Sequence, residues 1–301
     1  MLDVSERVPL EGWLSIEYVK VTDSLAVAAI EPEAAIEDLV DRLDSARGVL
    51  LSSSYEYPGR YTRWDMGFVD PPLAVSSCGD TVRFEALNAR GEVLLVPVRT
   101  VLKELGFASI VEDDDEHVVC RIERGDLRFE EEERSRQPSS FAVVRAAVDL
   151  FMGADEHLGL YGAFGYDLAF QFEPIDLKLP RLATQQDLVL YVPDEIIVVD
   201  HQGGIAERRR YDFAYDGLGT ADISRSGARE AYQPDLELTS IRDHERGEYA
   251  EVVELAREYF ARRDLFEVVS SQTFIEPSPE PPSELFRRLK EQNPSPYGFL
   301  I

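Results

Sequence analysis

The stretch Leu188-Val-Leu-Tyr-Val-Pro-Asp-Glu-Ile-Ile-Val-Val199 contains two short apolar runs that are interrupted by Pro193 and Asp194. Short apolar runs that are rich in β-branched residues and bounded by turn residues predict strands, here at Leu188–Val192 and Glu195–Val199. The same grounds predict further strands at Leu14–Val19, Val49–Ser53, Val82–Leu87, Val93–Val96 and Val118–Ile122.

Other segments carry apolar residues at the spacing of one helix face. Helices are predicted from Pro32 through Leu43, over Val98–Leu105 with Gly106 as the end, from a Ser139 or Ser140 cap through Phe151, and over Tyr249–Phe260. The repeated switch between a period of two and a period of 3.6 excludes an all-α or all-β protein and predicts an α+β or α/β one.

Composition suggests how the chain is divided. Ala214–Glu237 lacks periodicity and mixes Gly, Ser, Asp and Pro, so it is expected to connect two lobes. The expected units are therefore residues 1–213, a connecting loop at 214–237, and a second region at 238–301. The final run, Tyr297–Ile301, follows a Pro-rich turn and is expected to be a strand that begins and then stops.

The charge balance restricts the partners of the chain. Among 301 residues, 31 Lys and Arg face 58 Asp and Glu, which gives a formal net charge of −27. Such a surface repels nucleic acid and anionic lipid, so neither is an expected partner. Any site for an anion must be built locally from Arg, Lys, backbone N–H groups or a metal.

Several other kinds of site are not expected. No apolar run approaches the roughly 18 residues of a membrane span, and Met1–Trp13 carries acids where a signal peptide needs a basic start, so a cytoplasmic location is expected. Cys78 and Cys120 lack metal-ligand spacing and are expected to be buried apolar groups. The acidic runs Glu112–Glu116 and Glu130–Glu133 are expected to be solvated loops.

Four segments carry a family resemblance through their order and spacing. They are Gly48–Ser54 with Tyr57-Pro-Gly-Arg-Tyr-Thr-Arg-Trp-Asp65, Gly162-Ala-Phe-Gly-Tyr-Asp167 with Asp187–Asp194, Asp264-Leu-Phe-Glu-Val-Val269 with Gln272, and Asn293-Pro-Ser-Pro-Tyr297. Together they resemble the N-terminal half of the large, chorismate-binding subunit of anthranilate synthase, especially the bacterial form fused to a glutamine amidotransferase. Without the family, Gly162 and Gly165 predict a tight turn between strands, and Asp264–Val269 a helix end that passes into a strand.

The resemblance implies a layered α+β fold, an α/β/β/α sandwich with two sheets face to face and helices outside, of which this chain would hold only part. It implies that the complete enzyme converts chorismate and glutamine-derived ammonia to anthranilate and pyruvate with Mg²⁺, in tryptophan biosynthesis. The implied partners are a glutamine amidotransferase domain or subunit and a C-terminal chorismate-binding half. The family's metal-binding glutamates and catalytic histidine match no residue here, so no catalytic or metal residue is assigned and this chain is expected to be inactive alone.

The resemblance also implies an allosteric pocket for tryptophan. Ser53 corresponds to the family's effector-binding serine, and Pro296, Tyr297 and Gly298 correspond to the opposite wall. Hydroxyls, strand backbone and Pro-Tyr surfaces suit an amino acid that has a flat apolar ring.

This sequence departs from the family pattern at several positions. Ser52 stands where the family often has Glu, which removes one partner for a ligand's ammonium, and Gly298 stands where a larger residue is common. Arg263 replaces a usual Gly at a helix end, where a left-handed conformation would cost about 1 kcal/mol. Ser270-Ser271 replaces a usual Pro-Gly or similar pair.

Other interpretations remain open. The chain could be a tryptophan-binding regulatory module without catalysis, or a structural half that a separately encoded C-terminal half completes. It could also derive from a relative that makes para-aminobenzoate, isochorismate or salicylate, although the Tyr57–Tyr61 segment and the long N-terminal region favour anthranilate synthase.

Overall fold

The fold is built on two antiparallel sheets. The computed structural model describes residues 20–54, 63–123, 137–172, 175–176, 181, 184–235, 237 and 239–301. The first sheet has the order β1 (Thr22–Ala29), β11 (Ile205–Tyr215), β10 (Glu195–Asp200), β3 (Trp64–Val69), β2 (Gly48–Ser52) and β15 (Phe299–Leu300), with β12 (Leu218–Gly219) paired to β11. The second has the order β6 (Ala108–Asp113), β7 (His117–Ile122), β5 (Thr81–Ala86), β4 (Leu73–Cys78), β9 (Leu188–Val192) and β8 (Tyr161–Phe164).

The chain crosses between the two sheets at short connections. Pro193 and Asp194 join β9 of the second sheet to β10 of the first, and residues 70–72 join β3 to β4. Asp70 has a left-handed backbone with a φ of 58° at this crossing. The two apolar runs of Leu188–Val199 therefore form consecutive strands, β9 and β10, that belong to different sheets.

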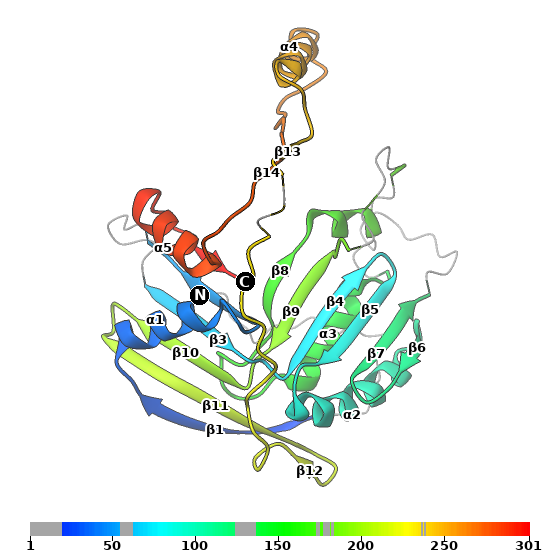
Figure 1. Ribbon diagram of the computed structural model, residues 1–301. Coiled ribbons are helices and arrows are strands. Elements are labelled where there is room, and N and C mark those ends of the chain that lie inside the picture. Colours follow the sequence, from blue (N-terminus) through cyan, green and yellow to red (C-terminus); the bar gives the residue numbers. More distant parts are fainter. Residues whose placement is uncertain are drawn as a thin grey trace.

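Helix α1 (Pro32–Arg42) covers the outer face of the first sheet. Pro32 occupies its first turn, and the Glu31 carboxylate accepts a hydrogen bond from the Ala34 N–H at 2.7 Å, which caps the helix. Leu39 and other buried residues of α1 pack on Leu50 and Ile197, and α5 (Pro282–Gln292) adds Phe286 to the same cluster. Figure 1 shows α1 and α5 side by side on this face.

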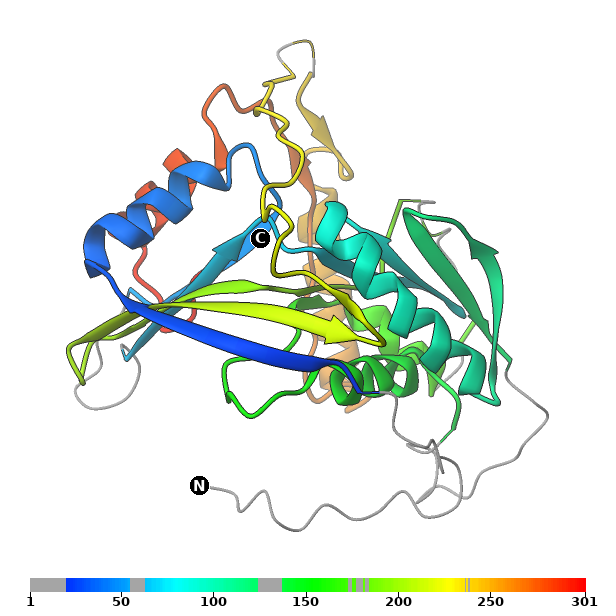
Figure 2. The same ribbon diagram turned by 90° about the horizontal axis from the view of Figure 1, so that it is seen from below.

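The inner face of the first sheet packs against the second sheet. The Phe68 ring of β3 lies edge-to-face with Tyr161 and Tyr191 of the second sheet, at centroid distances of 5.8 and 6.3 Å. Helices α2 (Ala89–Glu104) and α3 (Ser140–Phe151) complete the main core beside β5, where they surround Phe84 (Figure 2). The α+β class and the layered arrangement are confirmed.

Part of the chain projects away from both sheets. Helix α4 (Glu248–Ala261) stands on a narrow stem made of β13 (Ile241–Arg242) and β14 (Phe274–Ile275), at the top of Figure 1. None of the residues of α4 is buried, although Val252, Leu255 and Phe260 are apolar. None of the helices in the described ranges combines the length and apolar character that crossing a membrane requires.

Most predicted elements are confirmed, with boundaries shifted by one or two residues. The predicted helices at Pro32, Ser139 or Ser140, and Tyr249 form, and so do the strands at Val49, Val82, Val118, Leu188 and Glu195. Ser139 is the N-cap of α3, but its side chain makes no capping hydrogen bond. The Ser140 N–H instead donates to the Gln171 side-chain oxygen at 2.9 Å.

Two predictions, a strand at Val93–Val96 and a turn at Gly162, are wrong. Val93–Val96 is not a strand, because it lies in α2, a single helix that runs through Pro97 and buries Leu94 and Leu95. Gly162 lies within β8, paired with β9, rather than in a turn. A side chain at this position would meet the Val189 carbonyl oxygen at 2.0 Å, which explains the glycine.

The prediction that a helix end passes into a strand at Asp264–Val269 is also wrong, because the segment contains no strand and β14 begins only at Phe274. Cys120 is buried as predicted, whereas Cys78 is exposed at the end of β4. Leu14–Val19, Glu130–Glu133 and Tyr57–Thr62 lie outside the described residues.

The other predicted loops are partly strand. Glu112 and Asp113 end β6, and the rest of that acidic run forms the turn to β7. Within Ala214–Glu237, β11 continues to Tyr215 and pairs with β12. The chain then runs past α1, where the Glu230 N–H donates to the Ser45 carbonyl at 2.9 Å.

Candidate functional site

The two predicted walls of the effector pocket meet at a seam between β2 and residues 293–298. The Ser53 hydroxyl donates to the Pro296 carbonyl at 2.7 Å, and the Ser52 N–H donates to the Gly298 carbonyl at 2.8 Å. The ladder continues into β15, where Phe299 is opposite Leu51. Residues that are more than 240 positions apart in sequence are thus hydrogen-bonded neighbours.

Close backbone contact explains the glycine in this seam. A Cβ atom on residue 298 would lie 2.2 Å from the Ser52 carbonyl oxygen, a distance at which the two strands could not pair. The neighbouring positions tighten the contact, since the Ser54 N–H donates to the Ser295 carbonyl at 3.0 Å and the Ser295 N–H donates to the Ser54 hydroxyl at 3.1 Å. The departure from a larger residue at position 298 therefore has a structural cause.

Lys290, which sequence reasoning did not single out, reaches the same seam from the last turn of α5. Its Nζ donates to the Ser52 hydroxyl at 2.9 Å, and the Ser52 side chain is buried. Within the described ranges, no carboxylate forms an ion pair with Lys290. The position that often holds an acid in the family is here a serine that faces an ammonium group, so the seam carries a positive charge rather than a negative one.

Ion pairs fix α5, and with it the 293–298 wall, onto α1. The Asp44 carboxylate accepts from the Ser283 N–H at 2.9 Å and from the Ser283 hydroxyl at 2.5 Å at the start of α5. Arg287 binds Asp41 at 2.6 Å and Glu37 at 2.8 Å. Hydrogen bonding to Asp41, and also to Glu37, raises the pKa of the Arg287 guanidinium.

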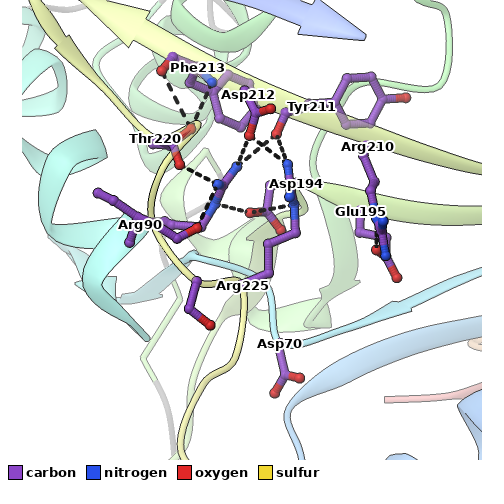
Figure 3. Close-up of polar contacts among 12 residues, drawn as sticks. Asp70, Arg90, Asp194, Glu195, Arg210, Tyr211, Asp212, Phe213, Thr220 and Arg225 are labelled. Carbon is purple, nitrogen blue, oxygen red and sulfur yellow. Dashed lines mark hydrogen bonds and ion pairs between the residues drawn. The ribbon is translucent and has the colours of Figure 1, made fainter. Parts of the chain in front are cut away.

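A second polar cluster, centred on Arg90, lies buried between α2, β11 and the segment after β12 (Figure 3). The Arg90 side chain has no exposed surface, and its Nε forms an ion pair with Asp194. Its Nη2 donates to the Tyr211 carbonyl at 2.8 Å and to Asp212 at 2.9 Å. Its Nη1 donates to the carbonyls of Thr220 and Ile223.

Asp194 is the buried acid of this cluster. Burial raises its pKa to about 6, although the charges of Arg90 and Arg225 oppose the shift. Arg225 lies 3.6 Å from Asp194 and binds Asp212 at 2.6 Å. The cluster joins α2, the β9–β10 crossing and the segment after β12, so it is a structural junction between the two sheets.

Sequence reasoning missed this cluster because an isolated arginine in the first turn of a helix gives no local signal. Asp194 lies within the second family segment, which was the one available indication. The four histidines pair with neighbouring acids, for example His201 with Asp65 at 3.0 Å and His157 with Asp155 at 3.2 Å. Among the residues that the structure describes, no group of three or more His, Cys, Asp or Glu could hold a metal ion.

Comparison with known proteins identifies a family for this chain. Residues 108–301, more than half of the chain, match the family of chorismate binding enzymes. The chain is 45% identical over 282 residues to "Anthranilate synthase" of Azospirillum brasilense, which covers 93% of this chain and 38% of that protein. It is 30% identical over 268 residues to "Anthranilate synthase component 1" of Vibrio parahaemolyticus, which covers 84% of this chain and 48% of that protein.

The "Anthranilate synthase component 1" of Escherichia coli is 29% identical over 259 residues, which span 77% of this chain and 46% of that protein. The chain thus spans about half or less of the length of these relatives. The matched family, the order of the four segments and the two-sheet fold lead to one assignment. This chain belongs to the family of chorismate binding enzymes.

Proposed function

We propose that this chain forms the N-terminal part of an anthranilate synthase, which converts chorismate and ammonia to anthranilate and pyruvate. The observation that carries this proposal is the 45% identity over 93% of the chain to an anthranilate synthase. The chain covers 38% of that relative, so the proposed activity is that of the completed enzyme. Mg²⁺ would be held by residues outside this chain, and a glutamine amidotransferase would supply the ammonia.

The exposed apolar surface of α4 supports completion by a C-terminal half. Val252, Val253 and Phe260 lie on the predicted apolar face of this helix, and each is more than a third exposed. An amphipathic helix of 14 residues gains little stability without a surface to bury that face. A folded C-terminal half that covers α4 would provide this surface.

The proposal is tested by complementation. Residues 1–301 alone, supplied with chorismate, Mg²⁺ and ammonia, should form no anthranilate. Co-expression with the C-terminal half of the Azospirillum brasilense relative should restore ammonia-dependent anthranilate formation, detected by its fluorescence. A V253K/F260K variant should fail to be complemented, whereas E258Q, at an exposed position on the opposite side of the same helix, should behave as the parent chain does. Anthranilate formation by residues 1–301 alone would contradict the proposal.

We further propose that the seam binds tryptophan as an effector. The Lys290 ammonium is placed to bind the ligand's carboxylate, and the Ser53 hydroxyl oxygen can accept a hydrogen bond from its ammonium. Pro296 and Tyr297 offer apolar surface for the indole ring. Lys290 would thus supply a charged partner for the ligand's carboxylate, at a seam where Ser52 stands in place of an acid that could pair with the ligand's ammonium.

Titration calorimetry with tryptophan tests this second proposal. Saturable heat is expected for the parent chain. S53A and K290M should each weaken binding about tenfold, the equivalent of one lost charge-assisted hydrogen bond. K103M, at an exposed lysine of α2, is the matched control and should bind as the parent does. Binding that is insensitive to S53A and K290M, or an absence of saturable heat, would exclude an effector site at the seam. Tryptophan binding without complementation would instead favour a regulatory module without catalysis.

A further inference from the structure

An arginine-rich cavity of about 420 Å³ lies between the end of α1, the β10–β11 hairpin and residues 223–229. Five guanidinium groups line it, those of Arg42, Arg208, Arg210, Arg225 and Arg229. None of these residues belongs to the seam between β2 and residues 293–298. This local concentration of arginine occurs in a chain whose formal net charge is −27.

Each carboxylate in the cavity is shared by two arginines. Asp70 binds Arg42 at 3.2 Å and Arg229 at 2.5 Å. Glu195 binds Arg210 at 2.6 Å and lies 3.6 Å from Arg208. Arg42 also binds Asp38 at 3.3 Å, so the two arginines at Asp70 are matched by two carboxylates. Arg208 and Arg210 share Glu195 alone among the described residues, and this pair retains one positive charge.

Asp194, the third acid in the cavity wall, is shared in the same way by Arg225 and the fully buried Arg90. Arg225 and Arg90 also bind Asp212, so these two arginines face two carboxylates, and the six arginines together keep a formal excess of one positive charge over their five carboxylate partners. The charge excess in the cavity is opposite in sign to the net charge of the whole chain, so the cavity attracts anions.

The cavity also offers hydrogen-bond donors that are not used. The Nε–H groups of Arg208 and Arg225 are buried and form no hydrogen bond, because the carboxylates that face them, Glu195 and Asp194, lie 3.6 Å away. An oxyanion in the cavity could accept from these N–H groups at hydrogen-bond distance. The hydroxyls of Ser224 and Ser226, which lie 2.7 Å apart in the same wall, could donate as well.

We propose that this cavity binds a small oxyanion, and that Arg208, Arg210, Arg225 and Arg229 are its ligands. The wall holds more arginines than carboxylates, and the volume admits a phosphate-sized or dicarboxylate-sized group. Planar guanidiniums bind both groups through paired N–H donors. The ligand could be a free or esterified phosphate or a dicarboxylate. Titration with inorganic phosphate and with succinate distinguishes these two classes.

The test is calorimetry of residues 1–301 at low ionic strength with inorganic phosphate and with succinate. Saturable 1:1 binding of at least one anion is expected, and the tighter of the two identifies the source. R210Q and R229Q should each weaken binding about tenfold, the free-energy equivalent of about 1.4 kcal/mol. Both side chains are close to half exposed, at 49% and 41%, so these variants should fold, which circular dichroism will verify.

R257Q is the matched control, because Arg257 is 72% exposed on α4, is far from the cavity wall in sequence, and among the described residues forms an ion pair with Glu254 alone. Unchanged affinity in R257Q together with weakened binding in R210Q and R229Q supports the proposal. Equal weakening in all three variants would mean non-specific attraction by net charge and would overturn it. Absence of saturable heat with both anions at millimolar concentration would also overturn it.

Discussion

Replacement of Arg90 by methionine tests the buried junction directly, because methionine fills much of the arginine volume without its charge. The change removes the ion pair to Asp194 and the hydrogen bonds to the carbonyls of Thr220 and Ile223. Asp194, only 2% exposed, would retain Arg225 at 3.6 Å as its remaining cation. Removal of one partner from a buried ion pair costs about 3–5 kcal/mol, a large share of the roughly 5–15 kcal/mol that stabilises a typical domain.

The loss should depend on pH in a defined direction. Because burial raises the pKa of Asp194 to about 6 in the folded state, the folded chain binds the Asp194 proton more tightly than the unfolded chain does. Protonation therefore favours folding, and its contribution is present at low pH and lost as the pH rises through about 6. Without Arg90 the carboxylate is even harder to ionise, so R90M should lose less stability at pH 5 than at pH 8.

Urea unfolding followed by circular dichroism measures these losses. R225M is the matched control, because Arg225 is partly exposed and leaves the pair of Arg90 and Asp194 intact, so a smaller loss is expected. An R90M/D194N double variant should recover part of the R90M loss, since the unpaired charge is then removed. A loss below about 1 kcal/mol for R90M, or equal losses at pH 5 and pH 8, would show that Arg90 does not stabilise a buried Asp194 carboxylate.

Three further predictions concern single positions. G298A should speed hydrogen exchange of the Ser52 amide, because the new Cβ would meet the Ser52 carbonyl oxygen at 2.2 Å; unchanged protection would show that the seam accommodates a side chain. R263G should slow amide exchange in α4 roughly two- to fivefold, because the residue after the helix has a φ of 64° that glycine adopts without strain; faster exchange would mean that the flexibility of glycine outweighs the relieved strain. Alkylation should modify exposed Cys78 in the folded chain but not Cys120, because burial raises the pKa of the Cys120 thiol to about 11; mass spectrometry of tryptic peptides reads the outcome, and equal labelling would contradict it.

The reach of sequence reasoning is clearest where local pattern and packing agree. Leu188–Val192 and Glu195–Val199 are strands because their apolar β-branched runs suit buried sheets, and α1 begins at a proline beside an acidic cap. The left-handed conformation at Arg263 was also anticipated, because a helix end that usually carries glycine has a specific backbone requirement.

The same reasoning fails where a segment satisfies two patterns. Val93–Val96 is apolar enough for a strand, yet it forms the centre of α2, where one helix face is buried against β5. Pro97 would ordinarily argue against a helix that continues, so tertiary packing outweighs the local preference here.

Periodicity and motif order were enough to establish the α+β class, the order of most elements and the family, because both depend on residues that are near one another in the chain. Which charged groups form pairs became known from the folded structure. Arg90 forms an ion pair with Asp194, which lies about a hundred residues further along the chain, and Lys290 near the C-terminus binds Ser52. The arginines of the cavity come from α1, β11 and the segment after β12. The physical reason is that the energy of a charge depends on burial and on its partners in space, which local sequence spacing does not encode.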